Sequence, residues 1–341
     1  MSRVVTFGEV LLRLSPDVGT RILQANKLAV NYGGSEANVA SSLALLGDSA
    51  TLVSKVPNNM LGKAAVKNFR GLGVDTSQIK IGGQRLGIYF FEKGASVRGT
   101  KVIYDRNNSS FATCDDSEFD WKVILKDADY FYFSGITAAI SDELRKLLID
   151  AVKFCKDNDI KVVCDLNYRG KLWTPSEAQR FMGKIMPFVT VCIANDEDFK
   201  QSLGIDAFDG DMTRGIEQKS DFIRGMKTIK NKYPNVEIVA SVLRNIYSVE
   251  KSTWMALMLK DGNVYESPQY KLHVLEGVAG GDAFGAGLMH GLVNNYADQK
   301  CIDFAIAASV SKLTIVGDLN ISSQEDIEEV MNSDTAVRLA R

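Results

Sequence analysis

The sequence predicts an α/β protein with a mainly parallel sheet, helices on both faces and a small additional β-sheet. Short apolar runs alternate with helical patterns along most of the chain, starting with a buried strand at Val4 to Phe7. Such alternation favours parallel strands joined by covering helices. One aromatic and β-branched stretch, Gly87 to Glu92 followed by Val102 to Tyr104, interrupts this order and predicts a separate lid hairpin.

Composition limits the classes of function. The formal net charge is −2 and no Lys/Arg-rich run is present, which argues against a nucleic-acid partner. No apolar stretch approaches the roughly 20 residues of a membrane span. The five scattered cysteines indicate reduced thiols, so a cytoplasmic protein is expected. With two histidines in the chain, a histidine metal site or a Ser-His-Asp triad is disfavoured.

No low-complexity linker divides the 341 residues, so a single domain over 1–341 is expected, with lid segments at about 10–32 and 85–112. Gly33-Gly34 precede a predicted helix in which Ser35 can cap, Glu36 suits the first turn and Gly47 can end the helix. Ser322 and Glu325 have the spacing of a capping box for a last helix.

Ligands of such sheets bind beyond the carboxyl ends of the strands. Three segments therefore become candidates: Asp165 to Arg169, Asn195 to Asp198, and the turn before Asp282. Within that turn, small residues and the unpaired N–H groups of a helix start would form an anion hole. An aspartate there would repel phosphate, unless it takes a proton from an attacking hydroxyl. The alternative is that Asp282 merely caps a glycine-rich helix.

Two segments far apart in the chain resemble the signatures of one family. Gly33-Gly34-Ser35-Glu36-Ala37-Asn38-Val39-Ala40 is similar to the N-terminal signature of the PfkB (ribokinase-like) carbohydrate kinases, and Gly280-Gly281-Asp282 to the end of their C-terminal G-A-G-D motif. The usual P-loop and G-x-G-x-x-G nucleotide motifs are absent. The resemblance implies a three-layer α/β/α ribokinase-like core with a β-sheet lid, and transfer of a phosphoryl group from ATP with Mg²⁺.

The resemblance also assigns residues. Asp282 is the expected base, and Ala279, Gly280 and Gly281 the anion hole. Asn195 and Asp198 match an N-x-x-E motif that organises Mg²⁺ through waters, while Asn195, Ser241, Arg244, Gly280 and Gly281 are assigned to the nucleotide. A monovalent cation is left open. The chain departs from the family pattern with alanine at 279, glutamate at 276 and aspartate at 198; alanine would be strained at 279 if that position needs a positive φ.

The sugar side of the site is predicted from the lid and from the segment after the strand ending at Asp165. Tyr104 and Arg106 are two residues apart and would share a face of an extended strand. Two arginines, Arg106 and Arg169, would suit a carboxylate better than a neutral sugar. Three alternatives stay open: the tyrosines only cover apolar surface, Arg169 is a surface residue, or Asp105 and Arg106 form a local ion pair.

These stretches resemble the 2-keto-3-deoxygluconate kinase branch of the family. The resemblance implies sugar-acid contacts by Gly33, Gly34, Asn38, Tyr89, Tyr104, Arg106 and Arg169, and 2-keto-3-deoxy-6-phosphogluconate as the product. A kinase for the galactonate epimer, fructose or ribose is the first alternative, and a non-catalytic sugar-acid sensor the second. Lid sheets of this family often pair between subunits, so a homo-oligomer is expected.

Overall fold

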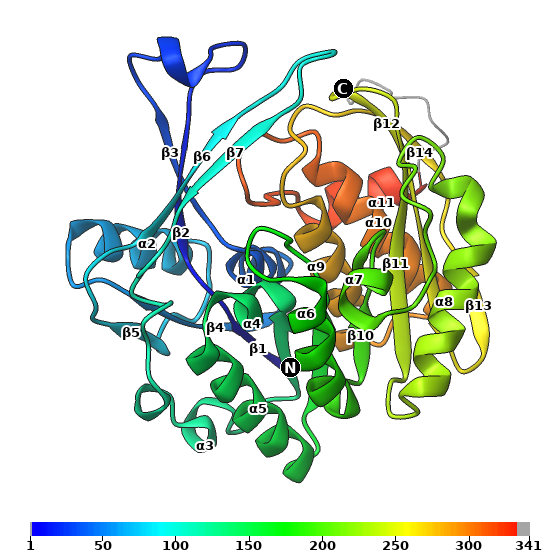
Figure 1. Cartoon of the computed structure of the whole chain (residues 1–341), viewed down its shortest axis with the longest axis horizontal. Coiled ribbons are helices and arrows are strands. Elements are labelled where there is room, and N and C mark those ends of the chain that lie inside the picture. Colours follow the sequence, from blue (N-terminus) through cyan, green and yellow to red (C-terminus); the bar gives the residue numbers. More distant parts are fainter. Residues whose placement is uncertain (1, 333–341) are drawn as a thin grey trace.

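A central sheet of ten strands organises the molecule (Figure 1). The computed structural model describes residues 2–332 of the chain. The strands lie in the order β13-β12-β11-β10-β9-β8-β1-β4-β5, with β14 also paired to β12. Their bounds are β1 Arg3–Phe7, β4 Ser49–Val56, β5 Ile79–Ile81, β8 Tyr130–Ser134, β9 Lys161–Asp165, β10 Val191–Ile193, β11 Ile238–Ile246, β12 Lys251–Lys260, β13 Asn263–Glu266 and β14 Tyr270–His273.

The sheet is parallel from β5 through to β11, and antiparallel where β12 pairs with β11, β13 and β14. The prediction of a mainly parallel sheet is therefore confirmed. Because the carboxyl ends of the parallel strands share one edge, the loops that follow β9 and β10 lie beside each other.

Helices cover both faces of this sheet, as the alternating pattern predicted. Side chains of β1 show the division: Val5 and Phe7 belong to one apolar core, and Val4 belongs to the other. The first core is completed by α3 Trp121–Ile124, α4 Gly135–Ile140, α5 Asp142–Asp157, α6 Pro175–Ile185, α7 Asp198–Leu203 and α8 Lys219–Lys232. The second is completed by α1 Ser35–Leu45, α2 Met60–Gly71, α9 Gly280–Val293 and α10 Asp298–Lys312, on which α11 Gln324–Asn332 packs. No helix within residues 2–332 is long and apolar enough to cross a lipid bilayer.

A second sheet of four strands, the lid sheet, projects from this core at the upper left of Figure 1. Its order is β3-β2-β6-β7, with β2 Leu11–Ser15, β3 Ala29–Gly33, β6 Gly87–Glu92 and β7 Lys101–Asp105. The β6–β7 pair is antiparallel, as expected for the hairpin predicted from the sequence. At its tip, the Ser96 N–H donates to Glu250 over 2.8 Å, which joins the lid sheet to the turn between β11 and β12.

The start of α1 differs from the expectation. Gly34 is the N-cap residue, and Ser35 is already inside the helix without capping it. Glu36 does lie in the first turn, as predicted, but it is 1% exposed and accepts hydrogen bonds from Ser134 and Thr137. Because the Glu36 carboxyl group is buried, it needs direct hydrogen-bond partners, and Ser134 and Thr137 provide them.

The capping box of the last helix is one residue later than predicted. Ser323 and Asp326 exchange the hydrogen bonds that were expected of Ser322 and Glu325. The two pairs have the same spacing, and Ser322 is instead almost buried with its N–H bonded to Asn320. Tertiary contacts therefore selected between two equivalent local patterns.

Candidate active site

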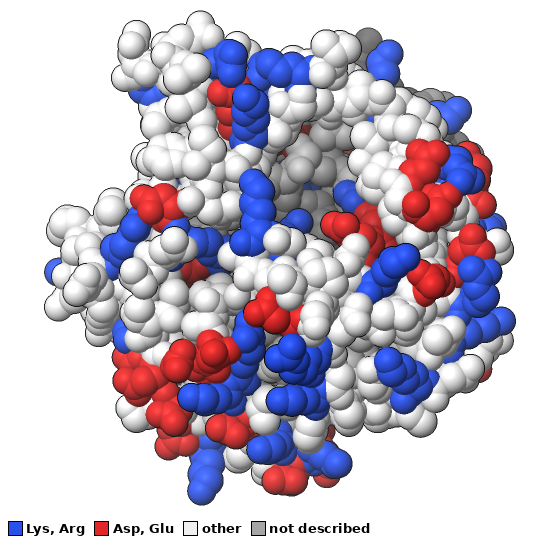
Figure 2. All heavy atoms as spheres, in the orientation of Figure 1, with Lys and Arg blue, Asp and Glu red and all other residues white. Residues whose placement is uncertain are grey.

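A cavity of about 570 Å³ lies between the lid sheet and the carboxyl ends of the central strands. Figure 2 shows the molecule hollowed beside the lid. The three segments predicted to follow the strands all contribute to its walls, as do the lid, the start of α1 and the turn before α9. Asp282, Arg106 and Arg169 line this one cavity, although they are distant in sequence.

Asp282 lies in the first turn of α9 and is held by two side chains from α1. The Ser35 hydroxyl donates to one carboxylate oxygen and the Asn38 amide to the other, each over 2.7 Å. Burial raises the pKa of Asp282, while the hydrogen bonds from Asn38 and Ser35 oppose that increase. A carboxylate oriented in this way is an acceptor that can take a proton from a bound hydroxyl. Asn38 was predicted as a contact of the sugar acid, so its hydrogen bond to Asp282 was missed, as was that of Ser35.

The turn before α9 has the backbone that an anion hole requires. Ala279 is its N-cap residue and has φ 58° and ψ 15°, in the left-handed region. The condition under which alanine would be strained is therefore met, at a cost of about 1–2 kcal/mol. The N–H groups of the following first turn have no carbonyl partner within the helix. A Cβ atom at Gly281 would meet open space, so a ligand can approach the backbone there.

The glycine pair before α1 has two separate functions. Gly34 lines the cavity and has φ 140°, and a Cβ there would lie 2.0 Å from the carbonyl oxygen of Glu9. Gly33 is not part of the cavity wall; a Cβ there would come within 2.8 Å of the Asp318 carboxyl group. The first glycine therefore makes room for Asp318, and the second allows the chain to enter α1 next to β1.

The two predicted arginines both line the cavity but differ in their partners. Arg106 forms an ion pair with Glu9, which the sequence analysis missed, and its guanidinium lies 5.6 Å from the Tyr104 ring centroid. The alternative pairing with Asp105 is wrong, because Asp105 pairs with Arg85 at 2.7 Å. Within residues 2–332, the exposed Arg169 side chain has no hydrogen bond or ion pair. Arg169 is therefore available to a ligand, whereas Glu9 already balances Arg106.

The two tyrosines of the lid sheet stand side by side over the cavity, with ring centroids 5.8 Å apart. Tyr89 is buried and its hydroxyl donates to Asp318, whereas Tyr104 is 47% exposed. Both line the cavity. The Tyr89 ring also packs with Leu11 and Phe91, so the alternative that it covers apolar surface is correct in part.

Asn195 and Asp198 have their side-chain oxygens directed at backbone groups. The Asp198 carboxylate accepts from the N–H groups of Tyr168 at 2.7 Å and of Asn195 at 2.8 Å. The Asn195 side-chain oxygen accepts from the Val242 N–H at 2.8 Å. Burial raises the pKa of Asp198 to about 7. Within residues 2–332, no group of three or more acidic, histidine or cysteine side chains is arranged to hold a metal ion directly.

Two other carboxylates nevertheless give this wall the chemistry that a divalent cation needs. One oxygen each of Asp165 and Asp196 is buried without a hydrogen-bond partner, and both residues line the cavity. Burial and the nearby Asp198 and Asp282 raise the pKa of Asp165 well above its ordinary range. These residues therefore fit Mg²⁺ that is held partly by waters and by a ligand's phosphates.

Of the two β11 residues assigned to the nucleotide, only one lines the cavity. Ser241 is fully buried, donates its hydroxyl to the Ala194 carbonyl and is not part of the cavity wall. Arg244 does line the cavity, pairs with Asp196 and lies 5.2 Å from the Trp254 ring centroid. Alternation along β11 explains the difference, because residues 241 and 244 face opposite sides of the strand.

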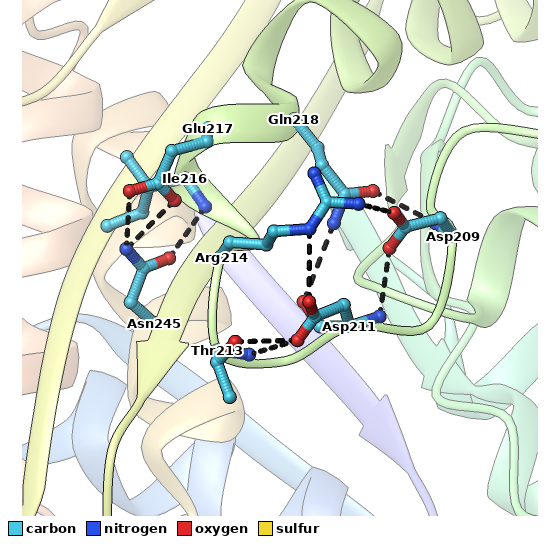
Figure 3. A network of polar contacts seen from close by, with 8 residues as sticks. All are labelled: Asp209, Asp211, Thr213, Arg214, Ile216, Glu217, Gln218 and Asn245. Atoms are coloured by element: carbon cyan, nitrogen blue, oxygen red, sulfur yellow. Dashed lines mark hydrogen bonds and ion pairs between the residues drawn. The ribbon is translucent and has the colours of Figure 1, made fainter.

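A loop that the sequence analysis missed forms the adjoining wall. It follows α7 and presents Phe208, Gly210 and Met212 to the cavity. Figure 3 shows how its backbone is fixed: Arg214 pairs with Asp209 and Asp211, and Asp211 also accepts from Thr213. The loop has no regular period, so only its glycine and aspartates could have indicated a structured turn.

Comparison with known proteins agrees with this architecture. Residues 1–324 match the pfkB family carbohydrate kinase description. The chain belongs to this family. A relative from Haloferax volcanii, a 2-dehydro-3-deoxygalactonokinase, is 31% identical over 336 residues, covering 98% of each chain. The chain is therefore a carbohydrate kinase, and the predicted family and ribokinase-like fold are confirmed.

Solved structures of the family extend the comparison. The 2-dehydro-3-deoxygluconokinase from Thermotoga maritima is 41% identical, with a TM-score of 0.93 and coverage of 98% of this chain and 100% of that one. A putative 2-keto-3-deoxygluconate kinase from Enterococcus faecalis is 25% identical, with a TM-score of 0.87 and full coverage of both. A putative ribokinase II from E. coli, solved with ATP and Mg²⁺, shares the fold at 16% identity and a TM-score of 0.78, covering 97% of this chain and 99% of that one.

Replacing Ala279 by glycine should stabilise the protein. Glycine relieves the left-handed strain of about 1–2 kcal/mol but loses about 0.4–1 kcal/mol through the greater freedom of the unfolded chain. A net gain of about 0–1.6 kcal/mol is expected in urea unfolding. The control is Ala151→Gly in the middle of α5, which should lose at least about 1 kcal/mol, because the helix propensity falls and a buried methyl group is removed. A loss of stability in both variants would show that Ala279 is not strained.

Proposed function

We propose that the protein transfers the γ-phosphoryl group of ATP to 2-keto-3-deoxygluconate and forms 2-keto-3-deoxy-6-phosphogluconate. The observation that carries the proposal is the position of Asp282, whose carboxylate is fixed by Ser35 and Asn38 beside a turn of free N–H groups. The Thermotoga maritima relative, at 41% identity, bears the name of this activity. We treat the whole chain as one kinase domain with the lid sheet as part of it.

In the proposed reaction, Asp282 accepts the proton of the sugar's primary hydroxyl as that oxygen attacks the γ-phosphorus. The N–H groups at Ala279 to Asp282 bind the phosphate oxygens and stabilise the charge that they carry in the transition state. Arg169, assisted by Arg106, holds the carboxylate of the sugar acid at the other end. Mg²⁺, when bound, neutralises phosphate charge; Asn195 and Asp198 are proposed to hold its waters, with Asp165 and Asp196 beside them.

Arg244 and the loop carrying Phe208 and Met212 are proposed to contact the nucleotide, since they line the cavity on the side of β11. Ser241 is buried behind this wall, and its proposed contribution is limited to positioning the strand. Replacing K⁺ by a tetraalkylammonium ion in the assay would show whether a monovalent cation also participates.

The galactonate epimer is the second candidate substrate, because the Haloferax volcanii relative is named for it. The candidates are separated by testing both keto-deoxy acids, fructose and ribose as substrates. The reaction with ATP and Mg²⁺ is monitored in each case by a coupled assay of ADP release. The gluconate-derived acid should have the highest kcat/KM, and the neutral sugars should be lower by up to about 10⁴, because they lack the carboxylate that Arg169 is proposed to bind. Equal turnover of a neutral sugar contradicts the carboxylate assignment, and no turnover of any substrate favours a sugar-acid sensor.

Asp282→Asn should lower kcat by about 10²–10⁴, the usual contribution of a general base. Since the base must be ionised and burial raises its pKa, wild-type kcat/KM should increase as the pH rises through that raised value. The variant should lack this dependence. As the pH rises through this value, the free energy of unfolding should fall in the wild type, because ionising a buried carboxyl with a raised pKa costs stability. It should fall less in Asp282→Asn, which has no carboxyl group at this position. Near-normal turnover would refute the assignment.

Arg169→Ala should mainly raise KM for the sugar acid. A hydrogen bond to a charged group contributes about 1.5–3 kcal/mol, which corresponds to roughly 10–150-fold. Arg180→Ala, at an exposed position of α6, is the matched control and should leave the kinetics unchanged. The kinetics of both variants with the sugar acid provide the measurement. Unchanged kcat and KM in Arg169→Ala would count against a role in substrate binding.

We also propose that the protein is a cytoplasmic homo-oligomer that binds no nucleic acid or membrane. The outer face of the lid sheet supports the oligomer, because Val30, Leu14, Phe90 and Ile103 are register neighbours across its four strands. Val30 and Ile103 are 58% and 54% exposed, which leaves an apolar row that a second lid sheet could cover. Light scattering gives the mass directly, and a monomer of 37.4 kDa would contradict this proposal.

A further inference from the structure

Arg13 is a buried arginine that connects the lid sheet to the core behind the cavity. It lies in β2, is 1% exposed and is not part of the cavity wall. Its guanidinium donates to the Ser15 hydroxyl at 2.9 Å and to Asp318 at 3.1 Å, and pairs with Glu276. One face covers the Phe91 ring at 4.2 Å.

The first carboxylate partner leads to the sugar side of the cavity. Asp318 uses one oxygen for Arg13 and accepts the Tyr89 hydroxyl with the other. Tyr89 belongs to β6 and lines the cavity next to Tyr104. A ligand that contacts the Tyr89 ring or hydroxyl therefore acts on a residue one hydrogen bond away from Asp318.

The second carboxylate partner leads to the phosphate side. Glu276 pairs with Arg13 through one oxygen and accepts the Gly317 N–H through the other at 3.0 Å. It comes directly before the turn of residues 277–281, which contains the strained Ala279. The side chain that Arg13 holds therefore lies at the start of this turn.

The formal charges of this buried cluster balance when a second cation is included. Lys312 is fully buried, donates to the Ile315 carbonyl at 3.0 Å and has its pKa lowered by burial to about 8, with Asp318 opposing the decrease. Arg13 therefore pairs with Glu276 and Asp318, and Lys312 lies near Asp318. A single ammonium group could not replace the arginine, because only the guanidinium fork reaches both carboxylates and Ser15 in fixed directions.

We propose that Arg13 is a positioning residue that couples sugar binding at the lid to the geometry of the phosphate-binding turn. The path runs from Tyr89 through Asp318 and Arg13 to Glu276. A sugar that contacts Tyr89 fixes Asp318 and Arg13, and Arg13 fixes the start of the turn. This inference rests on the proposed kinase function. By thermodynamic linkage, the sugar acid and the nucleotide should then strengthen each other's binding by the same factor.

The test compares Arg13→Lys with the wild type. The Kd of 2-keto-3-deoxygluconate is measured by calorimetry with and without β,γ-methylene-ATP and Mg²⁺. In the wild type the nucleotide analogue should lower this Kd by roughly 5–150-fold, the usual range of coupling between sites. In Arg13→Lys the ratio should fall below about 2-fold, because the ammonium cannot hold both carboxylates.

Arg3→Lys is the matched control, since Arg3 also holds a structural position, with its side chain bonded to Thr51 and to the carbonyls of Lys126 and Ile124. It should retain the wild-type coupling ratio. If Arg13→Lys does not fold, Glu276→Gln decides the question, because it keeps the side-chain shape and removes the ion pair. Glu276→Gln should also reduce the ratio below about 2-fold.

The outcomes separate this inference from the proposed function. A wild type that phosphorylates the sugar acid but shows no coupling, or variants that keep the wild-type ratio, overturn the role of Arg13 alone. A wild type that phosphorylates none of the sugars tested overturns the proposed function. A purely structural role for Arg13 would lower the unfolding midpoint and leave the ratio unchanged, which also contradicts the inference.

Discussion

The site depends on holding a carboxylate among backbone N–H groups that favour phosphate. Left to itself, Asp282 could accept from the N–H groups of its own helix start and close the anion hole. Ser35 and Asn38 instead direct both carboxylate oxygens toward α1. In the proposed reaction the packing of α1 against α9 is therefore a functional contact, and Gly34 permits it because no side chain fits against the Glu9 carbonyl.

The arrangement of charge around the cavity follows from the same requirement. Arg106 and Arg244 each form an ion pair with a carboxylate of the protein, whereas Arg169 forms none within residues 2–332. Its charge nevertheless opposes the increase in the pKa values of Asp165, Asp198 and Asp282. Paired arginines provide directed donors without adding net charge, and the unpaired one would attract the anionic substrate that is proposed above. The carboxylates Asp165, Asp196 and Asp198 lie along the β9–β10 side, where a divalent cation would offset them.

Much of this arrangement could be predicted from the sequence. Alternating apolar runs predicted the parallel sheet, and the strand ends correctly indicated Asp165 to Arg169 and Asn195 to Asp198 as cavity walls. The features that the sequence did not predict are tertiary contacts. Nothing local distinguishes Glu9 or Arg13 from a surface residue, and their partners lie 97 and 263 or more residues away. Ser35 looked like a cap because its local pattern suits one, and only the packing of α9 gives its hydroxyl a different acceptor.

The central claim is that Asp282 faces the hydroxyl to be phosphorylated while the arginines hold the acid. A crystal structure of the protein with 2-keto-3-deoxygluconate, β,γ-methylene-ATP and Mg²⁺ tests this most directly. The account predicts the primary hydroxyl at about 2.6–3.2 Å from an Asp282 carboxylate oxygen, the distance needed for proton transfer, with the sugar carboxylate against Arg169. A sugar bound with its carboxylate toward Asp282, or with that hydroxyl directed to another side chain, would contradict it.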